Sequence, residues 1–153
     1  MNGRPGHHAV VFEVGETGVG PLICFESTYP QIARAMVRSG ADILIVVTNN
    51  ASFQTSPAAA QHLQMSRMRA IEHGRAVVHA AISGISAFIA PDGSVLDRSA
   101  LFEQDLLRAV LPTSTGQTPY ARYGAFIEIA MGAGAAVVTA AAAAARGRRR
   151  RAA

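Results

Sequence analysis

Cys24 is the only cysteine of the chain, and it stands in the sequence PLICFESTYP at residues 21–30. A thiolate is a strong nucleophile, so a cysteine that opens a turn can attack a carbonyl carbon and hold the acyl group as a thioester. At such a turn the next backbone N–H can stabilise the oxyanion that forms. Glu26 lies close enough to tune the local charge. A lone cysteine in an apolar stretch is more often a small buried residue. Whether Cys24 is a nucleophile or a core residue therefore depends on the pattern of the rest of the chain.

The segments around Cys24 predict an α/β layered fold. Strands are expected at 8–15, 20–24, 41–49, 75–82 and 104–112, and a hairpin at 85–99 that turns at Pro-Asp-Gly. Helices are expected at 29–40 and 58–74. This order of elements is typical of α/β layers. It places Cys24 at the end of a buried strand, entering the turn before a helix.

The expected helix 58–74 and the strand that follows it carry most of the remaining reactive side chains. His62, His73 and His79 lack the i, i+4 spacing of a helical metal site, so neither a metal nor any other cofactor is expected. Met65 and Met68 are expected to pack in the core. The three basic residues Arg67, Arg69 and Arg75 are expected on a solvated or ion-paired face, with Glu72 as a partner for Arg69 or Arg75.

Residues 125–145 form an Ala- and Gly-rich apolar run that is long enough to cross a bilayer. Five of the 14 basic residues follow at once in RGRRRR, at 146–151. A span followed by clustered Arg predicts a cytoplasmic tail at 146–153 and an α/β domain, residues 1–124, on the extracytoplasmic side of the cell membrane. The tail is expected to meet anionic lipid headgroups and not nucleic acid. The alternative is an Ala-rich helix with a basic tail that binds any acidic partner.

Two long stretches carry a family resemblance: ICFESTYPQIARAMVRSGADILIVVTNNASF at 23–53 and QHLQMSRMRAIEHGRAVVHAAISGISAFIAPDGSVL at 61–96. They resemble the carbon–nitrogen hydrolase (nitrilase) superfamily. The elements QHLQMSRMRAIE and TPYAR, together with the expected span, resemble the apolipoprotein N-acyltransferases within it. The resemblance implies part of a nitrilase-like αββα sandwich, followed by one C-terminal transmembrane helix.

The resemblance also implies roles for individual residues. Cys24 falls on the family nucleophile, which takes an acyl chain from a phospholipid donor and passes it to the N-terminal diacylglyceryl-cysteine of a lipoprotein acceptor. Glu26 falls on a glutamate that supports the site. Phe25, Asn50 and Phe53 fall on positions that contact the substrate. Ser52 departs from the pattern, because the family usually has Trp there in NDAWFG.

The larger departure concerns the Glu-Lys-Cys triad that the resemblance implies. All 14 basic residues are Arg, so the chain has no Lys, and Glu13 and Glu16 lie too close to Cys24 to match the family base. The chain is therefore expected to be a C-terminal portion of an N-acyltransferase, inactive or nearly so by itself. Two alternatives stay open: a soluble nitrilase-type amidase with water as the acyl acceptor, and a non-catalytic membrane-anchored module.

Overall fold

A computed structural model describes residues 8–152, and it divides into two compact units between Ala121 and Arg122. Residues 1–7 and 153, at the ends of the expected domain and tail, lie outside the described part. The first unit contains a six-stranded mixed sheet with the strands in sequence order. The second unit is the greater part of one long helix.

The sheet is built around three parallel strands. These are β2 (Thr17–Ile23), β3 (Ile43–Thr48) and β4 (Ala76–Ala81). The antiparallel strand β1 (Phe12–Val14) pairs with β2, while β5 (Ala87–Ile89) and β6 (Val95–Arg98) extend the sheet beyond β4. The predicted Pro-Asp-Gly hairpin is present between β5 and β6, and Gly93 adopts φ +83°, a conformation that glycine reaches without steric strain. Because β2, β3 and β4 are parallel, their carboxyl ends meet at one edge of the sheet.

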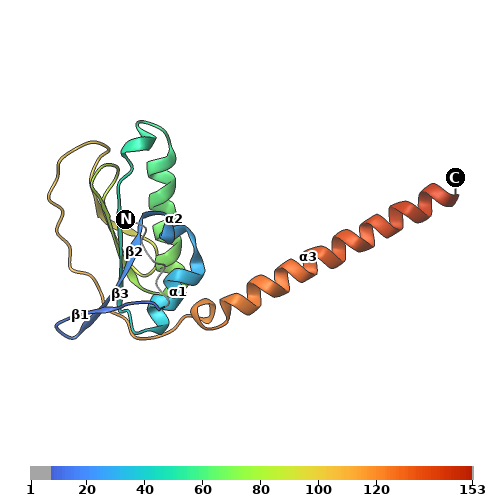
Figure 1. The fold of residues 1–153 in the computed structure, drawn as a ribbon, viewed down its shortest axis with the longest axis horizontal. Helices are drawn as coiled ribbons and strands as arrows, with labels where there is room; N and C mark the ends of the chain where they lie inside the picture. Colours follow the sequence, from blue (N-terminus) through green and yellow to red (C-terminus); the bar gives the residue numbers. More distant parts are fainter. Residues whose placement is uncertain (1–7, 153) are drawn as a thin grey trace, which may run out of the picture. The chain divides into compact units, whose positions relative to one another are not determined.

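Two helices cover one face of this sheet, as Figure 1 shows. α1 (Pro30–Arg38) connects β2 to β3, and α2 (Ala58–His73) connects β3 to β4. Proline fits the first turn of α1, and Gly74 ends α2 in the left-handed conformation. The core between helices and sheet contains Leu22, Ala33, Met36, Val37, Ala41, Leu44, Val46, Leu63, Ala70, Val77, Ala87 and Ile89.

Two expectations about side chains near α2 are wrong. Met65 and Met68 are 36% and 49% exposed, because α2 turns Leu63, Ser66 and Ala70 toward the sheet instead. Arg75 is buried at 3% exposure, where its guanidinium donates to the carbonyl oxygens of Ala41 (2.8 Å) and Gly116 (2.6 Å). The ion pair between Arg69 and Glu72 is present at 3.0 Å, as expected.

The other face of the sheet is apolar and largely uncovered by the described residues. The cross-strand pairs Phe12–Val19, Val19–Ile43 and Ile23–Val47 place one apolar set on this face. Its exposed members are Phe12, Val14, Ile23 and Val47, which are 57%, 65%, 59% and 43% exposed. We call these four residues the open face. Contiguous apolar surface of this kind marks a place where another layer or molecule packs.

The strand expected at 104–112 is not formed. Residues 103–118 have no regular secondary structure, and no described strand pairs with them. After them α3 (Pro119–Ala152) begins, with the Thr118 hydroxyl accepting from the Ala121 N–H at 2.9 Å. Within α3, residues 119–143 are long and apolar enough to cross a membrane, with a mean hydropathy of 1.8 over an 18-residue window.

Candidate active site

The nucleophile candidate occupies a strained turn at the carboxyl end of β2. Cys24 has φ +49°, a left-handed conformation that L-residues other than Asn and Asp rarely adopt. Strained residues of this kind cluster at functional sites, where the surrounding structure holds them in place. The turn leaves the thiol partly exposed, and a short 3-10 helix, η1 (Cys24–Thr28), follows at once.

Side chains of the turn close it from within. The Glu26 carboxylate accepts a hydrogen bond from the Ile23 N–H at 2.7 Å, on the residue just before Cys24. The Ser27 hydroxyl donates to the Cys24 carbonyl at 3.0 Å. Glu26 therefore contacts the backbone that carries the nucleophile, and its Oε2 is engaged there.

A buried polar network connects the turn to β3 and α2. The Thr48 hydroxyl lies 3.2 Å from the Cys24 Sγ and 3.3 Å from the Asn50 Oδ1. The His62 Nδ1 lies 3.2 Å from that same Oδ1, while its Nε2 lies 2.9 Å from the Ser27 hydroxyl and 3.0 Å from the Cys24 carbonyl oxygen. The surroundings of the thiol thus include Ser27 from the turn, Thr48 from β3, Asn50 from the loop after β3, and His62 from α2.

The thiol opens into an apolar cavity of about 240 Å³. Its lining residues are Cys24, Phe25, Phe53, Ala58, Gln61, His62 and Met65. The structure therefore brings three of the five predicted site residues, Cys24, Phe25 and Phe53, around one space. Asn50 is buried at 2% exposure behind this cavity's lining, and Glu26 lies on the turn. An apolar cavity beside a nucleophile suits the alkyl part of an acyl group.

The sequence profile of the carbon–nitrogen hydrolase family matches residues 3–120, which is most of the chain. The chain belongs to the carbon–nitrogen hydrolase family. Its resemblance to apolipoprotein N-acyltransferases is also confirmed. The chain is 37% identical to that of Geobacter metallireducens over 132 residues, 86% of this chain and 25% of the relative. It is 40% identical to that of Shewanella oneidensis over 106 residues, 69% of this chain and 20% of the relative. The chain thus spans a quarter or less of these relatives.

Solved structures of the nitrilase superfamily share the fold. An amidase from Nesterenkonia superposes with a TM-score of 0.53 at 23% identity, covering 63% of this chain and 39% of the amidase. Nit3 of Saccharomyces cerevisiae, of branch 10 of the superfamily, superposes with a TM-score of 0.54 at 18% identity, covering 66% of this chain and 40% of Nit3. The α/β expectation is therefore confirmed as a nitrilase-like fold, of which this chain forms one sheet and its helices.

Neither of the two carboxylates upstream of Cys24 lies near it. Glu13 pairs with Gly18 in the β1–β2 hairpin, and Glu16 precedes the first residue of β2, whereas Cys24 follows the last. Seven strand residues separate the two ends, a distance of roughly 20 Å. The chain has no Lys. Neither Glu13 nor Glu16 is therefore near enough to act on the Cys24 thiol.

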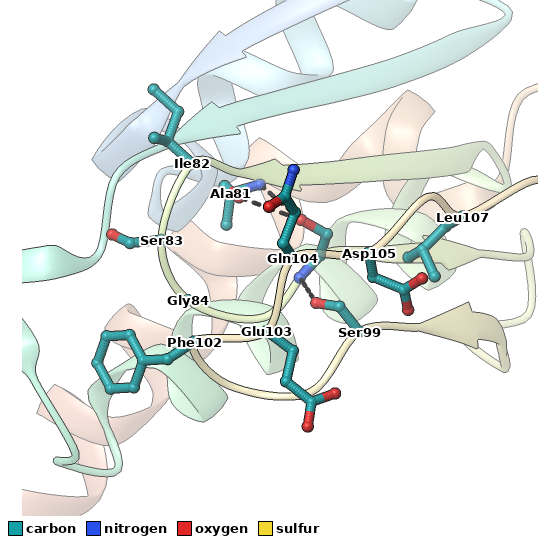
Figure 2. A pocket seen from close by; sticks show the side chains of 11 residues that line it. Ala81, Ile82, Ser83, Gly84, Ser99, Phe102, Glu103, Gln104, Asp105 and Leu107 are labelled. Carbon is teal, nitrogen blue, oxygen red and sulfur yellow. Dashed lines mark hydrogen bonds between the residues drawn. The ribbon is translucent and has the colours of Figure 1, made fainter.

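A second cavity, of about 390 Å³, lies beyond the end of β4 and shares no lining residue with the first. Figure 2 shows its walls, which come from residues 81–86 and 99–107. The hydroxyl groups of Ser86 and Ser99 are engaged by the backbone at Ala81 and Ser86, as its dashed lines mark. No group of three or more His, Cys, Asp or Glu side chains among the described residues could hold a metal ion. The described residues that line this cavity therefore form no metal-binding cluster.

Sequence reasoning missed Thr48 and considered His62 only as a metal ligand. The signal for Thr48 was its position at the end of a strand parallel to the one that ends at Cys24, since such ends share an edge. His62 gives no comparable signal, because its contact with a residue 38 positions away depends on how α2 packs. Burial lowers its pKa, while the bond to the Cys24 carbonyl raises it.

Proposed function

We propose that this chain is the catalytic C-terminal portion of an apolipoprotein N-acyltransferase. The observation that carries the proposal is the strained Cys24, whose thiol borders an apolar cavity at the sheet edge. The identity to N-acyltransferases over most of the chain supports the same branch of the family. The apolar helix supports a membrane location, and the Arg cluster after it supports an extracytoplasmic α/β unit.

The reaction would run in two steps through Cys24. In the first, the thiolate attacks the ester carbonyl of a phospholipid, the C–O bond breaks, and the lysophospholipid alkoxide leaves and takes up a proton. In the second, the α-amine of the lipoprotein's diacylglyceryl-cysteine attacks the thioester, the C–S bond breaks, and the amine's proton is lost as the thiolate is released. Phe25 and Phe53 would contact the acyl chain, and the Phe25 N–H would face the oxyanion.

The chain alone would lack the base for these steps. We infer that a further layer packs on the open face and supplies a Glu and a Lys. Two observations support this layer: Phe12, Val14, Ile23 and Val47 are exposed apolar residues of one sheet face, and residues 103–118 form no strand in this chain. The likeness to solved structures, of which the chain covers about two fifths, is in keeping with it.

A chimera tests the proposal. This chain replaces the matching C-terminal quarter of the Geobacter metallireducens relative, and membranes that contain the chimera receive a phospholipid with an alkyne-labelled acyl chain. We expect a hydroxylamine-labile label on the chimera, its loss in C24A, and only background labelling of the chain by itself. Labelling that persists in C24A, or a membrane-inserted chimera with no label, would contradict the proposal.

The amidase alternative gives a different outcome in the same chimera. With water as the acceptor, free fatty acid would appear whether or not a lipoprotein is present. With a lipoprotein acceptor, release of the label from Cys24 would require the diacylglyceryl-cysteine peptide and would leave the label on its amine. A C24A variant without any effect on lipoprotein acylation would favour the non-catalytic module.

A further inference from the structure

We infer that His62 is a positioning residue, which holds Cys24 in its left-handed conformation through the Cys24 carbonyl and the network behind it. This inference rests on the proposed role of Cys24 as the nucleophile. His62 is 5% exposed, and its ring is the point where η1, the end of β3 and α2 meet. Its hydrogen-bond partners are backbone or polar side chains, so the ring acts on the thiol through other groups.

The first contact of His62 acts on the backbone of Cys24. Cys24 itself has φ +49°. Its carbonyl oxygen accepts a hydrogen bond from the Ser27 hydroxyl at 3.0 Å and lies 3.0 Å from the His62 Nε2. A left-handed residue relaxes by turning its peptide groups, which would move this carbonyl. Two buried partners that hold the oxygen therefore resist that relaxation, and Ser27 is itself fixed by Nε2 at 2.9 Å.

The second contact acts on the thiol through Asn50 and Thr48. The Thr48 hydroxyl has one hydrogen and two acceptors at nearly equal distance, the Cys24 Sγ at 3.2 Å and the Asn50 Oδ1 at 3.3 Å. When the His62 Nδ1 donates to the Asn50 Oδ1, at 3.2 Å, that oxygen has a donor and the Thr48 hydrogen is free for the sulfur. Without His62, Asn50 competes with the sulfur for the Thr48 hydrogen.

The Cys24 carbonyl and the Asn50 Oδ1 are both acceptors. A neutral ring has one N–H, so the contact with the Cys24 carbonyl requires the tautomer with hydrogen on Nε2 and the contact with Asn50 the tautomer with hydrogen on Nδ1. Only a protonated ring makes both contacts at once. Glutamine at this position has an amide that reaches about as far as Nε2, so it can keep the bond to the Cys24 carbonyl. Leucine keeps the bulk of the side chain and removes every hydrogen bond.

A double-mutant cycle separates holding from ordinary packing. The variants H62L and H62Q are made in the natural chain and in the C24G background, where glycine needs no support at positive φ. We expect H62L to lower the urea midpoint at least twice as much in the natural chain as in C24G, and H62Q to recover most of the loss. The matched control is H73L, which removes a buried histidine elsewhere on α2 and should lower the midpoint equally in both backgrounds.

Alkylation of Cys24 by iodoacetamide adds a readout that packing alone does not predict. A looser fold would expose the thiol and speed its alkylation, whereas loss of positioning would slow the alkylation. We expect alkylation of H62L to be about tenfold slower than that of the natural chain, as for one lost hydrogen bond. We expect alkylation of H62Q to stay within about threefold of the natural rate. Equal midpoint losses in both backgrounds, or faster alkylation of folded H62L, would overturn the inference. Failure of the chimera to take label with an intact cycle would overturn the proposed function alone.

Discussion

Replacing Cys24 with glycine is expected to stabilise the turn relative to replacing it with alanine. Both variants remove the sulfur and its contact with Thr48, so they differ only in the Cβ atom at φ +49°. A Cβ in the left-handed region costs about 1–2 kcal/mol. Glycine in ordinary backbone instead lowers stability by about 0.5–1 kcal/mol relative to alanine, through the entropy of the unfolded chain. The net expectation is that the free energy of unfolding of C24G is about 1 kcal/mol larger than that of C24A.

Urea unfolding in detergent micelles, followed by circular dichroism, measures this difference. With a slope of about 2 kcal/mol per molar urea, 1 kcal/mol corresponds to a midpoint shift of roughly 0.5 M. The control is Ala35→Gly at an exposed position within α1, where the same loss of Cβ should lower stability by about 1 kcal/mol. A C24G variant that is less stable than C24A would refute the assignment of strain to residue 24.

Two further predictions concern the core. Burial lowers the pKa of His73 and His79 from 6.5 to about 4, with nearby Arg69 adding to the shift at His73 and His62 at His79. Between pH 6.5 and about 4 the unfolded chain then binds more protons than the folded one. The free energy of unfolding should therefore decrease as the pH is lowered through that window, by about 3 kcal/mol per histidine. Urea midpoints that stay flat from neutral pH to about pH 5 would contradict this. Gly20→Ala places a Cβ 2.9 Å from both the Met36 and Ala41 Cβ atoms, so it should destabilise by about 1–3 kcal/mol. A variant as stable as the natural chain would show that α1 can move away from β2.

The sequence predicted the parts of the fold that depend on local patterns. Each of these patterns can be recognised in a short stretch of sequence: the apolar runs of β3 and β4, the proline that begins α1, and the Pro-Asp-Gly hairpin. The strand at 104–112 was predicted on the same kind of pattern and is not formed, and no described strand pairs with that segment. An alternating apolar pattern indicates a preference for extended backbone, but a β-strand forms only where that backbone also pairs with another strand.

The candidate site divides in the same way. Cys24 is predictable because the turn at the end of β2 is a local feature, whereas Phe25 and Phe53 were predicted from the family resemblance. The contacts of His62 span 35 and 38 residues, so they follow from how α2 lies against the sheet. Arg75 shows the same limit, since its buried bond to Ala41 is invisible in a sequence where arginine ordinarily indicates surface.

The open face and the incomplete catalytic set lead to one physical conclusion. Ile23 belongs to the open face and is 59% exposed, and the next residue in the chain is Cys24. A layer that covers Ile23 and its neighbour Val47 would lie beside the residue that precedes Cys24, but on the face of the sheet opposite the cavity that α2 lines. A Glu and a Lys from that layer would have to reach around the carboxyl end of β2 to the side where Cys24 contacts Thr48 and lines the cavity. Under the proposed function, the layer that covers the open face would therefore also have to supply the Glu and the Lys.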